Sequence, residues 1–382
     1  MTYKKMFFLA TGISLLTLSN AHAFETKARN AILMDFETGK YIFTKNHQEM
    51  IPPASMSKLM TVYVLLNKIK DGEISLDDTF SVSENAWRKG GAASGGSTMF
   101  LKIGQEVSVE NLIKGIIIQS GNDACITVAE NIAGSEEEFA SLLNETAQKI
   151  GLKNANFENS TGLPHPEHRI SVEDLAILAR HIIKDFPEFY HFFKQKEFTF
   201  NNIKQGNRNP LLYSLKGADG LKTGHTDEAG YCLTGSVERG NRRLIEVVTG
   251  LSSNKERSEE TESLMTWGFA TFDNYTFFKK NQIIAEVPVW YGTKNSIQAV
   301  VPDTIRLTIK KSKKHKYTAS ASYNTPITAP IKKGEKIGEL FIKYGDKTIE
   351  KYPLVAKEDI TKMSTFNRII ENIKHFIFGS EK

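Results

Sequence analysis

The sequence predicts a chain of mixed α/β class, of the α+β kind, in which an antiparallel sheet flanked by helices is followed by a small all-β sandwich domain. Two strand-like regions, 29–46 and 217–252, enclose a mostly helical middle, so both ends of the first domain contribute to one sheet. From about residue 277 the helical periodicity gives way to short alternating runs. With 382 residues and 40% hydrophobic content, the chain is long enough for two such domains.

The first 23 residues have the order of a secretory signal peptide. Lys4 and Lys5 precede the apolar run MFFLATGISLLTL, and the small residues AHA end at Ala23, after which we expect cleavage. No later run reaches the roughly 20 apolar residues that a transmembrane helix needs. The sequence therefore predicts an exported chain that begins at Phe24 and is soluble or peripheral.

Charge and cysteine content exclude two classes of protein. The net charge is +5, of which Lys4 and Lys5 supply two units, and this is not the signature of a nucleic-acid-binding protein. The basic run at 310–316 is interpreted as a solvated loop. Only Cys125 and Cys232 are present, so no disulfide framework holds the fold, and the pair forms either one bridge or two buried thiols.

The first domain, residues 24–276, opens with a hairpin and a buried helix. Region 29–46 contains two β-rich runs joined by ETGK, a short turn with glycine. Region 57–72 is apolar almost all round and ends at Asp-Gly, which predicts a helix that is buried on most faces.

Two helices with a break between them are predicted next. Regions 108–120 and 123–134 both have helical periodicity, and the chain between them reads Gly121-Asn122.

The remainder of the first domain returns to strands. Ser171 with Asp174 three residues later predicts a capping box at the start of a helix. Three short strand-like runs follow in 217–252, the last two joined at Arg-Gly-Asn, and a further helix is predicted at 256–269. Region 277–357 then supplies the runs of the β-sandwich domain.

The string SMSK, from Ser55 to Lys58, stands at the start of the predicted buried helix. It is either an ordinary helix start or a nucleophilic serine with a lysine base. The unpaired N–H groups of a first helical turn suit a developing oxyanion, and a lysine at i+3 projects on the same side as the serine. A lysine with the ordinary pKa of about 10.4 is a poor base, so burial and a second cation are needed to bring it toward about 7 to 8.

Two further strings favour the catalytic interpretation. Ser120 and Asn122 lie in SGN at the break between two helices, where a hydroxyl can pass on a proton and an amide can bind a substrate amide. Lys222 in KTG supplies the second cation, and Gly224 in the same string allows a substrate backbone to lie close to a strand.

These three strings, in this order, resemble the motif set of penicillin-binding proteins and class A β-lactamases. With STMFLKIGQEVSVENL, KTGHT, LMTWGF and the signal peptide, nearly the whole mature chain resembles low-molecular-mass penicillin-binding proteins of the D-alanyl-D-alanine carboxypeptidase (peptidase S11) family. The resemblance implies a serine β-lactamase/DD-peptidase-like catalytic domain. It also implies a serine carboxypeptidase that removes the C-terminal D-alanine of peptidoglycan pentapeptides through an acyl-enzyme and is inhibited covalently by β-lactams.

The resemblance also assigns the catalytic roles. Ser55 is the acylated nucleophile, Lys58 its base and Ser120 the proton relay toward the leaving D-alanine. Asn122 holds the substrate amide.

A second group of residues binds substrate by the same resemblance. Lys222 serves the electrostatics of the pocket, and Thr223 with the backbone at Gly224 receives the terminal carboxylate. The main-chain N–H of His225 joins that of Ser55 in the oxyanion hole, and a packed histidine is the alternative. Arg257 is a second carboxylate contact or a solvated surface arginine. No cofactor and no metal are implied.

Three alternatives stay open at the level of sequence. A class A β-lactamase would carry a Glu-x-x-Leu-Asn string after the second motif, whereas this region reads FENSTGLPHPEHRIS, so Glu158 and Glu167 are interpreted as loop acids. A DD-endopeptidase acting on cross-links would use the same motifs. A non-catalytic wall-binding scaffold would have lost a motif residue, and none is missing.

The last segment, 358–382, is predicted to form an amphipathic helix. Its apolar positions recur at spacings of three and one, while Arg368 and Lys374 take other faces. The apolar positions are Met363, Phe366, Ile369, Ile370, Ile373, Phe376 and Ile377. This helix either docks on the β-domain or lies in a membrane interface. The second interpretation places the mature protein in the periplasm, peripherally attached to the outer face of the cytoplasmic membrane.

Overall fold

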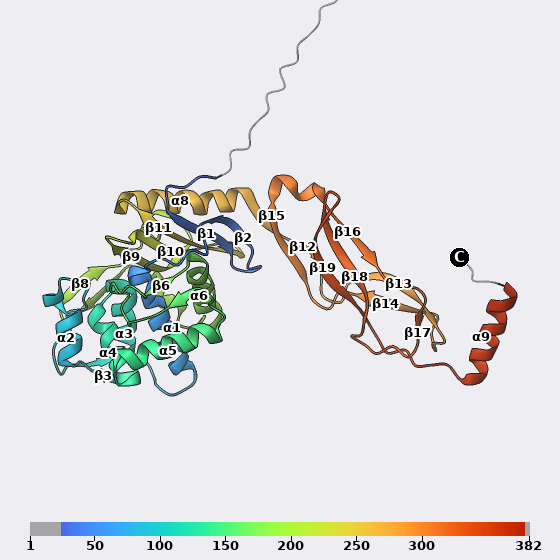
Figure 1. Ribbon diagram of the computed structural model, residues 1–382, viewed down its shortest axis with the longest axis horizontal. Helices are drawn as coiled ribbons and strands as arrows, with labels where there is room; N and C mark the ends of the chain where they lie inside the picture. Colours follow the sequence, from blue (N-terminus) through green and yellow to red (C-terminus); the bar gives the residue numbers. More distant parts are fainter. Residues whose placement is uncertain (1–23, 379–382) are drawn as a thin grey trace, which may run out of the picture.

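The computed structural model describes residues 24–378, and side chains as far as residue 373. The expected signal peptide, 1–23, lies outside the described residues. Two bodies are joined end to end: a larger one with the sheet and most helices, and an elongated β-rich one that ends in helix α9 (Figure 1). The expected α+β class with a C-terminal β-domain is confirmed.

A five-stranded antiparallel sheet forms the centre of the first body, in the order β2-β1-β11-β10-β9. Its strands are β1 Asn30–Asp35, β2 Tyr41–Lys45, β9 Ala218–Thr226, β10 Gly230–Arg239 and β11 Arg242–Leu251. The expected hairpin and the expected pairing of both ends of the domain are therefore confirmed. Strand β9 occupies an edge of this sheet, which leaves one of its sides open to another chain.

Helices cover both faces of this sheet. Leu264 and Met265 of α8 pack on Leu33 and Leu244 of the sheet, and the helical body covers the opposite face with a larger core. The helices are α1 Lys58–Lys70, α2 Glu84–Gly90, α3 Val109–Lys114, α4 Asn122–Ala133, α5 Glu136–Lys149, α6 Val172–Asp185, α7 Leu211–Ser214 and α8 Asn254–Thr271. Shorter helical turns are η1 Ala54–Ser57, η2 Ala92–Ser94, η3 Gly115–Gln119, η4 Tyr190–Lys194 and η5 Lys311–Lys316. Three small hairpins pair β3 Thr79–Ser81 with β4 Glu106–Ser108, β5 Ala155–Asn156 with β6 Arg169–Ile170, and β7 Glu197–Phe200 with β8 Ile203–Gly206.

Of the two hydrogen bonds of the capping box predicted for α6, one is formed. Ser171 Oγ accepts a hydrogen bond from the backbone N–H of Asp174 at 3.0 Å, as expected. The carboxylate of Asp174 instead accepts from the N–H groups of Lys153 and Asn154. The N–H of Ser171 donates to the carbonyl of Asn154, so a loop partner replaces the reciprocal bond of the box.

The second body contains a six-stranded sheet, in the order β16-β18-β19-β14-β13-β17, and the two-stranded ladder β12-β15. Its strands are β12 Phe272–Phe278, β13 Ile283–Trp290, β14 Ser296–Val300, β15 Ile305–Lys310, β16 Tyr317–Ser322, β17 Ile327–Thr328, β18 Lys336–Tyr344 and β19 Lys347–Ala356. A separate apolar core, including Val287, Ile297 and Leu340, fills it. The domain boundary expected between residues 276 and 277 falls within β12.

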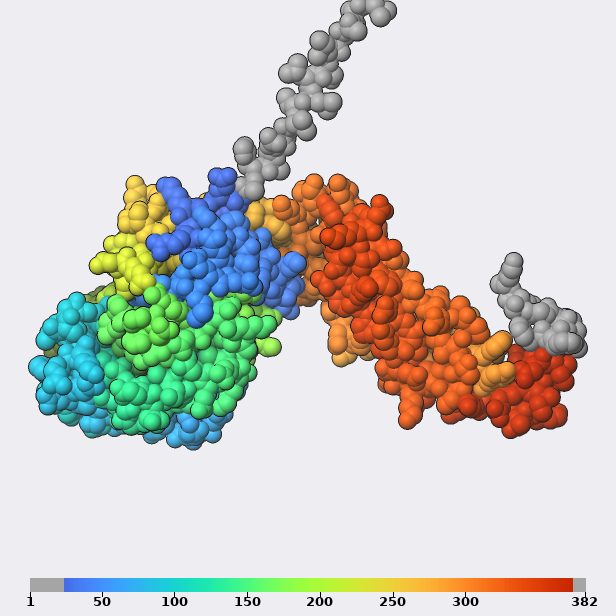
Figure 2. Space-filling view, viewed as in Figure 1, coloured from blue at the N-terminus to red at the C-terminus, as the bar shows by residue number. Residues whose placement is uncertain are grey.

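A buried polar network joins the two bodies. The carboxylate of Asp35 accepts hydrogen bonds from Thr38, from Asn274 Nδ2 and from Arg242 Nε. Arg242 Nη1 in turn donates to the carbonyl of Phe272 at 2.6 Å. Figure 2 shows the connection between the bodies at one end of the β-rich domain and α9 at its other end.

Helix α9, Thr365–Phe378, confirms the expected terminal helix. Its start is fixed to the turn after β13, because the N–H of Met363 donates to the carbonyl of Tyr291 and Tyr291 OH donates to Asn372 Oδ1 at 2.6 Å. Phe366, Ile369 and Ile373 are exposed, the first by 72%. Within 24–378, no helix has both the length and the apolar character that crossing a membrane requires.

Candidate active site

Ser55 and Lys58 are brought together by a 3₁₀ turn. Turn η1 carries Ser55, and α1 begins at Lys58, so the serine lies one turn before the α-helix and not within it. Side chains at i and i+3 eclipse each other in a 3₁₀ geometry, which aligns the two. Lys58 Nζ lies 3.0 Å from Ser55 Oγ, and the lysine is fully buried.

Lys58 Nζ has two further oxygen partners. Asn122 Oδ1 lies at 2.8 Å and the carbonyl oxygen of Thr161 at 2.5 Å. Both oxygens only accept hydrogen bonds, whereas the Ser55 hydroxyl also donates. When Lys58 is neutral, its two N–H groups point to Asn122 and Thr161 and its lone pair points to the Ser55 hydroxyl. The geometry is that of a base ready to take the serine proton.

The break between the two predicted helices places the second motif. The segment Gly115–Gln119 forms a π-turn, Ser120 adopts a left-handed conformation with φ of 62°, and α4 begins at Asn122. Wide π-turns of this kind occur often at functional sites. The predicted interruption is confirmed, one residue earlier than expected. Ser120 Oγ accepts a hydrogen bond from Lys222 Nζ at 3.0 Å, so this motif contacts the third one.

The KTG string lies on the edge strand β9. A Cβ atom at Gly224 would lie 3.1 Å from both Ala54 Cβ and the carbonyl of Pro53. The missing side chain therefore lets β9 lie directly against the turn that carries Ser55, a role that the sequence did not predict. His225 is exposed and its ring lies 4.0 Å from the ring of Tyr231, and the role expected for its main-chain N–H stays a prediction.

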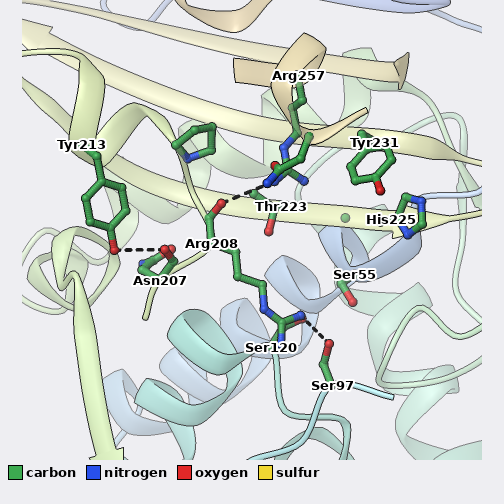
Figure 3. Close-up of a pocket in the computed structure, with 13 residues that line it drawn as sticks. Ser55, Ser97, Ser120, Asn207, Arg208, Tyr213, Thr223, His225, Tyr231 and Arg257 are labelled. Carbon is green, nitrogen blue, oxygen red and sulfur yellow. Dashed lines mark hydrogen bonds between the residues drawn. The ribbon is translucent and has the colours of Figure 1, made fainter. Parts of the chain in front are cut away.

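A cavity of about 530 Å³ opens above these residues (Figure 3). Six of the nine predicted residues line it, whereas Lys58, Asn122 and Lys222 are buried and do not line it. The six lining residues are Ser55, Ser120, Thr223, Gly224, His225 and Arg257. The sequence analysis missed Ser97, Asn207, Arg208, Pro210, Tyr213, Tyr231 and Asn254.

Two arginines line this cavity. Arg257 of α8 is only 5% exposed, so the surface-arginine alternative is wrong. Its guanidinium bonds to Asn254 Oδ1 at 2.5 Å and lies 5.7 Å from the centre of the Tyr231 ring. Arg208 lies beside Arg257, whose Nη2 donates to the carbonyl oxygen of Arg208 at 3.4 Å, and the Arg208 side chain extends toward Ser97, where Nη1 donates to Ser97 Oγ (Figure 3). Nothing in the local sequence NRNP distinguished Arg208 from a surface residue, because its position depends on the fold.

Burial sets the electrostatics of the lysines. Burial first, and then the charge of the Arg208 guanidinium, lower the pKa of Lys58 to about 8. The pKa of Lys222 is held well below its usual range by burial first and then by the charge of Lys58. The sequence analysis assigned Lys222 as the cation that acts on Lys58. The two buried lysines repel each other, as the lowered pKa of Lys222 shows, and Arg208 is a further cation that disfavours the charge of both.

Both cysteines are free, buried thiols, so the bridge considered from the sequence is not formed. Burial raises the pKa of Cys125 to about 12. Glu158 and Glu167 do not line the cavity, and Glu158 Oε1 accepts from Asn156 Nδ2. A glutamate of the class A β-lactamase type is therefore absent from the residues that line this cavity.

Comparison with known proteins gives two family matches. The model for "D-alanyl-D-alanine carboxypeptidase" matches residues 17–253, and that for "Penicillin-binding protein 5, C-terminal domain" matches residues 272–362. The D-alanyl-D-alanine carboxypeptidase DacC of Escherichia coli K12 is 41% identical over 359 residues, which is 92% of this chain and 90% of the relative. DacA of the same organism is 38% identical over 358 residues, which is 92% of this chain and 89% of the relative.

Solved structures of penicillin-binding proteins and related enzymes have the same fold as this chain. Penicillin-binding protein 5 from Haemophilus influenzae superposes with a TM-score of 0.81 at 37% identity, over 89% of this chain and 99% of that protein. The Streptomyces K15 DD-transpeptidase superposes with a TM-score of 0.61 at 26% identity, over 65% of this chain and 99% of that protein. These similarities do not favour the endopeptidase or scaffold alternatives.

Proposed function

Because this chain belongs to the D-alanyl-D-alanine carboxypeptidase family of serine peptidases, we propose that it removes the C-terminal D-alanine from peptidoglycan pentapeptides through an acyl-enzyme. The observation that carries the proposal is the contact of Lys58 Nζ with Ser55 Oγ, flanked by two oxygens that only accept hydrogen bonds. This arrangement activates a nucleophile at the foot of an open cavity.

Acylation begins when the Ser55 hydroxyl gives its proton to Lys58 Nζ. The serine oxygen then bonds to the carbonyl carbon of the penultimate D-alanine, and the carbonyl oxygen becomes an oxyanion held by the main-chain N–H groups of Ser55 and His225. As the carbon–nitrogen bond breaks, the proton that Lys58 took from Ser55 passes through Ser120 to the leaving amine, and Lys58 is neutral again. Lys222, which donates to Ser120 Oγ, supports this transfer. Free D-alanine departs.

Deacylation repeats the sequence with water. A water molecule gives a proton to Lys58 and bonds to the ester carbon, and the bond to Ser55 Oγ breaks as the oxygen recovers its proton. The shortened peptide leaves with a new carboxylate. A β-lactam follows the acylation path, with its ring amide as the bond that breaks.

Substrate binding uses the edge of the sheet. An extended peptide adds to the open side of β9, and Asn122 Nδ2 donates to its amide carbonyl. Thr223, Gly224 and Arg257 receive the terminal carboxylate, because a guanidinium in a poorly solvated pocket favours a carboxylate.

Release of D-alanine from diacetyl-Lys-D-Ala-D-Ala tests this proposal. We expect steady release by the wild type and none by Ser55→Ala. The matched control is Ser94→Ala, in turn η2 outside the cavity lining, which should keep the wild-type rate. No release by folded wild-type protein would refute the proposed activity.

We also propose that the chain is exported by residues 1–23 and held at the outer face of the cytoplasmic membrane, on the periplasmic side, by α9. Supporting this are the exposed Phe366, Ile369 and Ile373 on α9, and the polar Arg368 for anionic head groups. One such helix gives reversible attachment.

Fractionation tests the attachment. The full chain should partition with membranes and be partly released by salt, whereas a chain that ends at residue 362 should be soluble. Phe366→Glu is a single-residue version of the same test. If the full chain, the truncated chain and Phe366→Glu all stayed in the soluble fraction, the attachment would be refuted, and α9 would be a helix packed on the β-domain.

A further inference from the structure

One buried pair beside the catalytic turn has no part in the proposed reaction. Ser57 lies between Ser55 and Lys58, and its Oγ is 2.7 Å from Nε2 of His168. Ser57 is fully buried and His168 is only 2% exposed. His168 belongs to the loop between β5 and β6, 111 residues further along the chain.

The second ring nitrogen fixes the direction of this hydrogen bond. The backbone N–H of Glu158 donates to Nδ1 of His168 at 3.1 Å, so Nδ1 carries a lone pair. In a neutral imidazole the proton is then on Nε2, which donates to Ser57 Oγ. Burial, aided by the charges of His165 and Lys58, lowers the pKa of His168 to about 4, which keeps the ring neutral.

The same loop supplies the carbonyl that orients the base. Thr161 O accepts from Lys58 Nζ, and Thr61 Oγ1 of α1 donates to the neighbouring carbonyl of Ser160 at 2.7 Å. A Cβ atom at Gly162 would lie 2.0 Å from the carbonyl oxygen of Ala54. The loop thus packs directly on turn η1, and His168 ties its far end to the residue beside Lys58.

We propose that His168 is a positioning residue for the catalytic base: its hydrogen bond to Ser57 holds the 158–168 loop in register with η1, so that the Thr161 carbonyl aims the Lys58 lone pair at Ser55. The inference rests on the proposed serine acylation. When the bond is lost, the loop is free to move relative to η1 and Lys58 loses one of its two fixed acceptors. The acylation rate constant then falls, while initial binding of the ligand does not change.

Stopped-flow acylation by a fluorescent penicillin separates the binding constant from the acylation rate constant. In His168→Phe the ring volume is kept against Phe157, whose ring lies 5.7 Å away, but both hydrogen bonds are lost. We expect this variant and Ser57→Ala each to lower the acylation rate constant by about 10- to 100-fold, since small misplacements of catalytic groups have effects of this size. The binding constant should stay within about threefold of wild type. The double variant should be no slower than the slower single variant, because both remove the same bond.

Rescue and control variants distinguish this role from a loss of stability. In His168→Gln the amide offers one donor and one acceptor at nearly the spacing of the ring nitrogens, so the acylation rate constant should return to within about threefold of wild type. Tyr63→Phe removes a bond from α1 to Asp185 and should leave the rate constant unchanged. The proposal would be overturned if folded His168→Phe or Ser57→Ala acylated at the wild-type rate. It would also be overturned if the losses of the two single variants multiplied in the double variant, or if His168→Gln did not restore the rate constant. If His168→Phe does not fold, Ser57→Ala and His168→Gln decide it. Failure of the wild type to acylate would instead refute the proposed function.

Discussion

At the scale of single residues, the proposed reaction depends on the protonation state of Lys58. The base is active only when neutral, and its pKa of about 8 means that the neutral fraction grows as pH rises toward that value. Burial provides most of this shift, and the Arg208 guanidinium adds to it. Two neighbours that only accept hydrogen bonds then set where the lone pair points.

The acylation rate constant should therefore rise about tenfold per pH unit below pH 7 and level off above about pH 8. Arg208→Ala removes a positive charge that lowers the pKa of Lys58, so this pKa rises and the midpoint of the profile moves to higher pH. At pH 7 the variant should acylate about two- to fivefold more slowly. Arg208→Lys keeps the charge and serves as the control. An unmoved midpoint in Arg208→Ala would contradict the assigned electrostatic role.

The buried carboxyl group of Glu246 should affect the stability of the fold and not the reaction. Glu246 of β11 is fully buried, lies opposite Gly235 on β10, and has no hydrogen-bond partner for either carboxylate oxygen among the described residues. Burial raises its pKa well above the usual range, so the folded state keeps the proton that the unfolded state loses above about pH 4.3. The free energy of unfolding of the wild type should then fall with rising pH in that window, by up to about 1.4 kcal/mol per pH unit.

Glu246→Gln should remove this slope, and urea unfolding between pH 5 and pH 8 measures it. The exposed Glu286 of β13 gives the matched control, Glu286→Gln, which should follow the wild type. If the free energy of unfolding changed with pH in the same way in Glu246→Gln and in the wild type, Glu246 would be ionised in the folded state and this prediction would be wrong.

At the scale of elements, the approach of β9 to turn η1 assembles the site. We expect Gly224→Val to push the strand away from Ala54 and lower the acylation rate constant by about 100-fold, and Gly224→Ala to have a smaller effect. Stopped-flow acylation measures both. Ala218→Val, at the far end of the same strand, should acylate at the wild-type rate. A wild-type rate in Gly224→Val would show that this close approach has no part in catalysis.

Elements and motif residues were predictable where a local pattern defines them. The hairpin at 29–46, the helix break before Asn122 and the buried start of α1 follow from turn chemistry and apolar periodicity. The Thr161 carbonyl was not predictable, because every residue carries a carbonyl and only the fold brings this one to Lys58. Arg208 and the Asp174 loop contacts were missed for the same reason.

At the scale of the whole molecule, β9, which supplies Thr223, Gly224 and His225 to the cavity lining, lies in the first body, and α9 lies at the far end of the β-rich body (Figure 1). The Asp35 and Arg242 network fixes the first body to the start of the β-rich body, and the Tyr291 contacts fix α9 to its tip. Buried hydrogen bonds of this kind hold the groups that they join in one arrangement, although Arg242 Nη2 has no hydrogen-bond partner among the described residues. In the proposed attachment through α9, the β-rich body separates the site from the membrane surface.

The central claim is that Ser55 is the nucleophile and that Lys58 activates it. Mass spectrometry of the protein after reaction with benzylpenicillin, followed by peptide mapping, tests it directly. We predict one adduct per chain, located on Ser55, absent from Ser55→Ala and slower to form by about 1,000-fold in Lys58→Ala. An adduct on another residue, or formation at the wild-type rate in Lys58→Ala, would contradict the account.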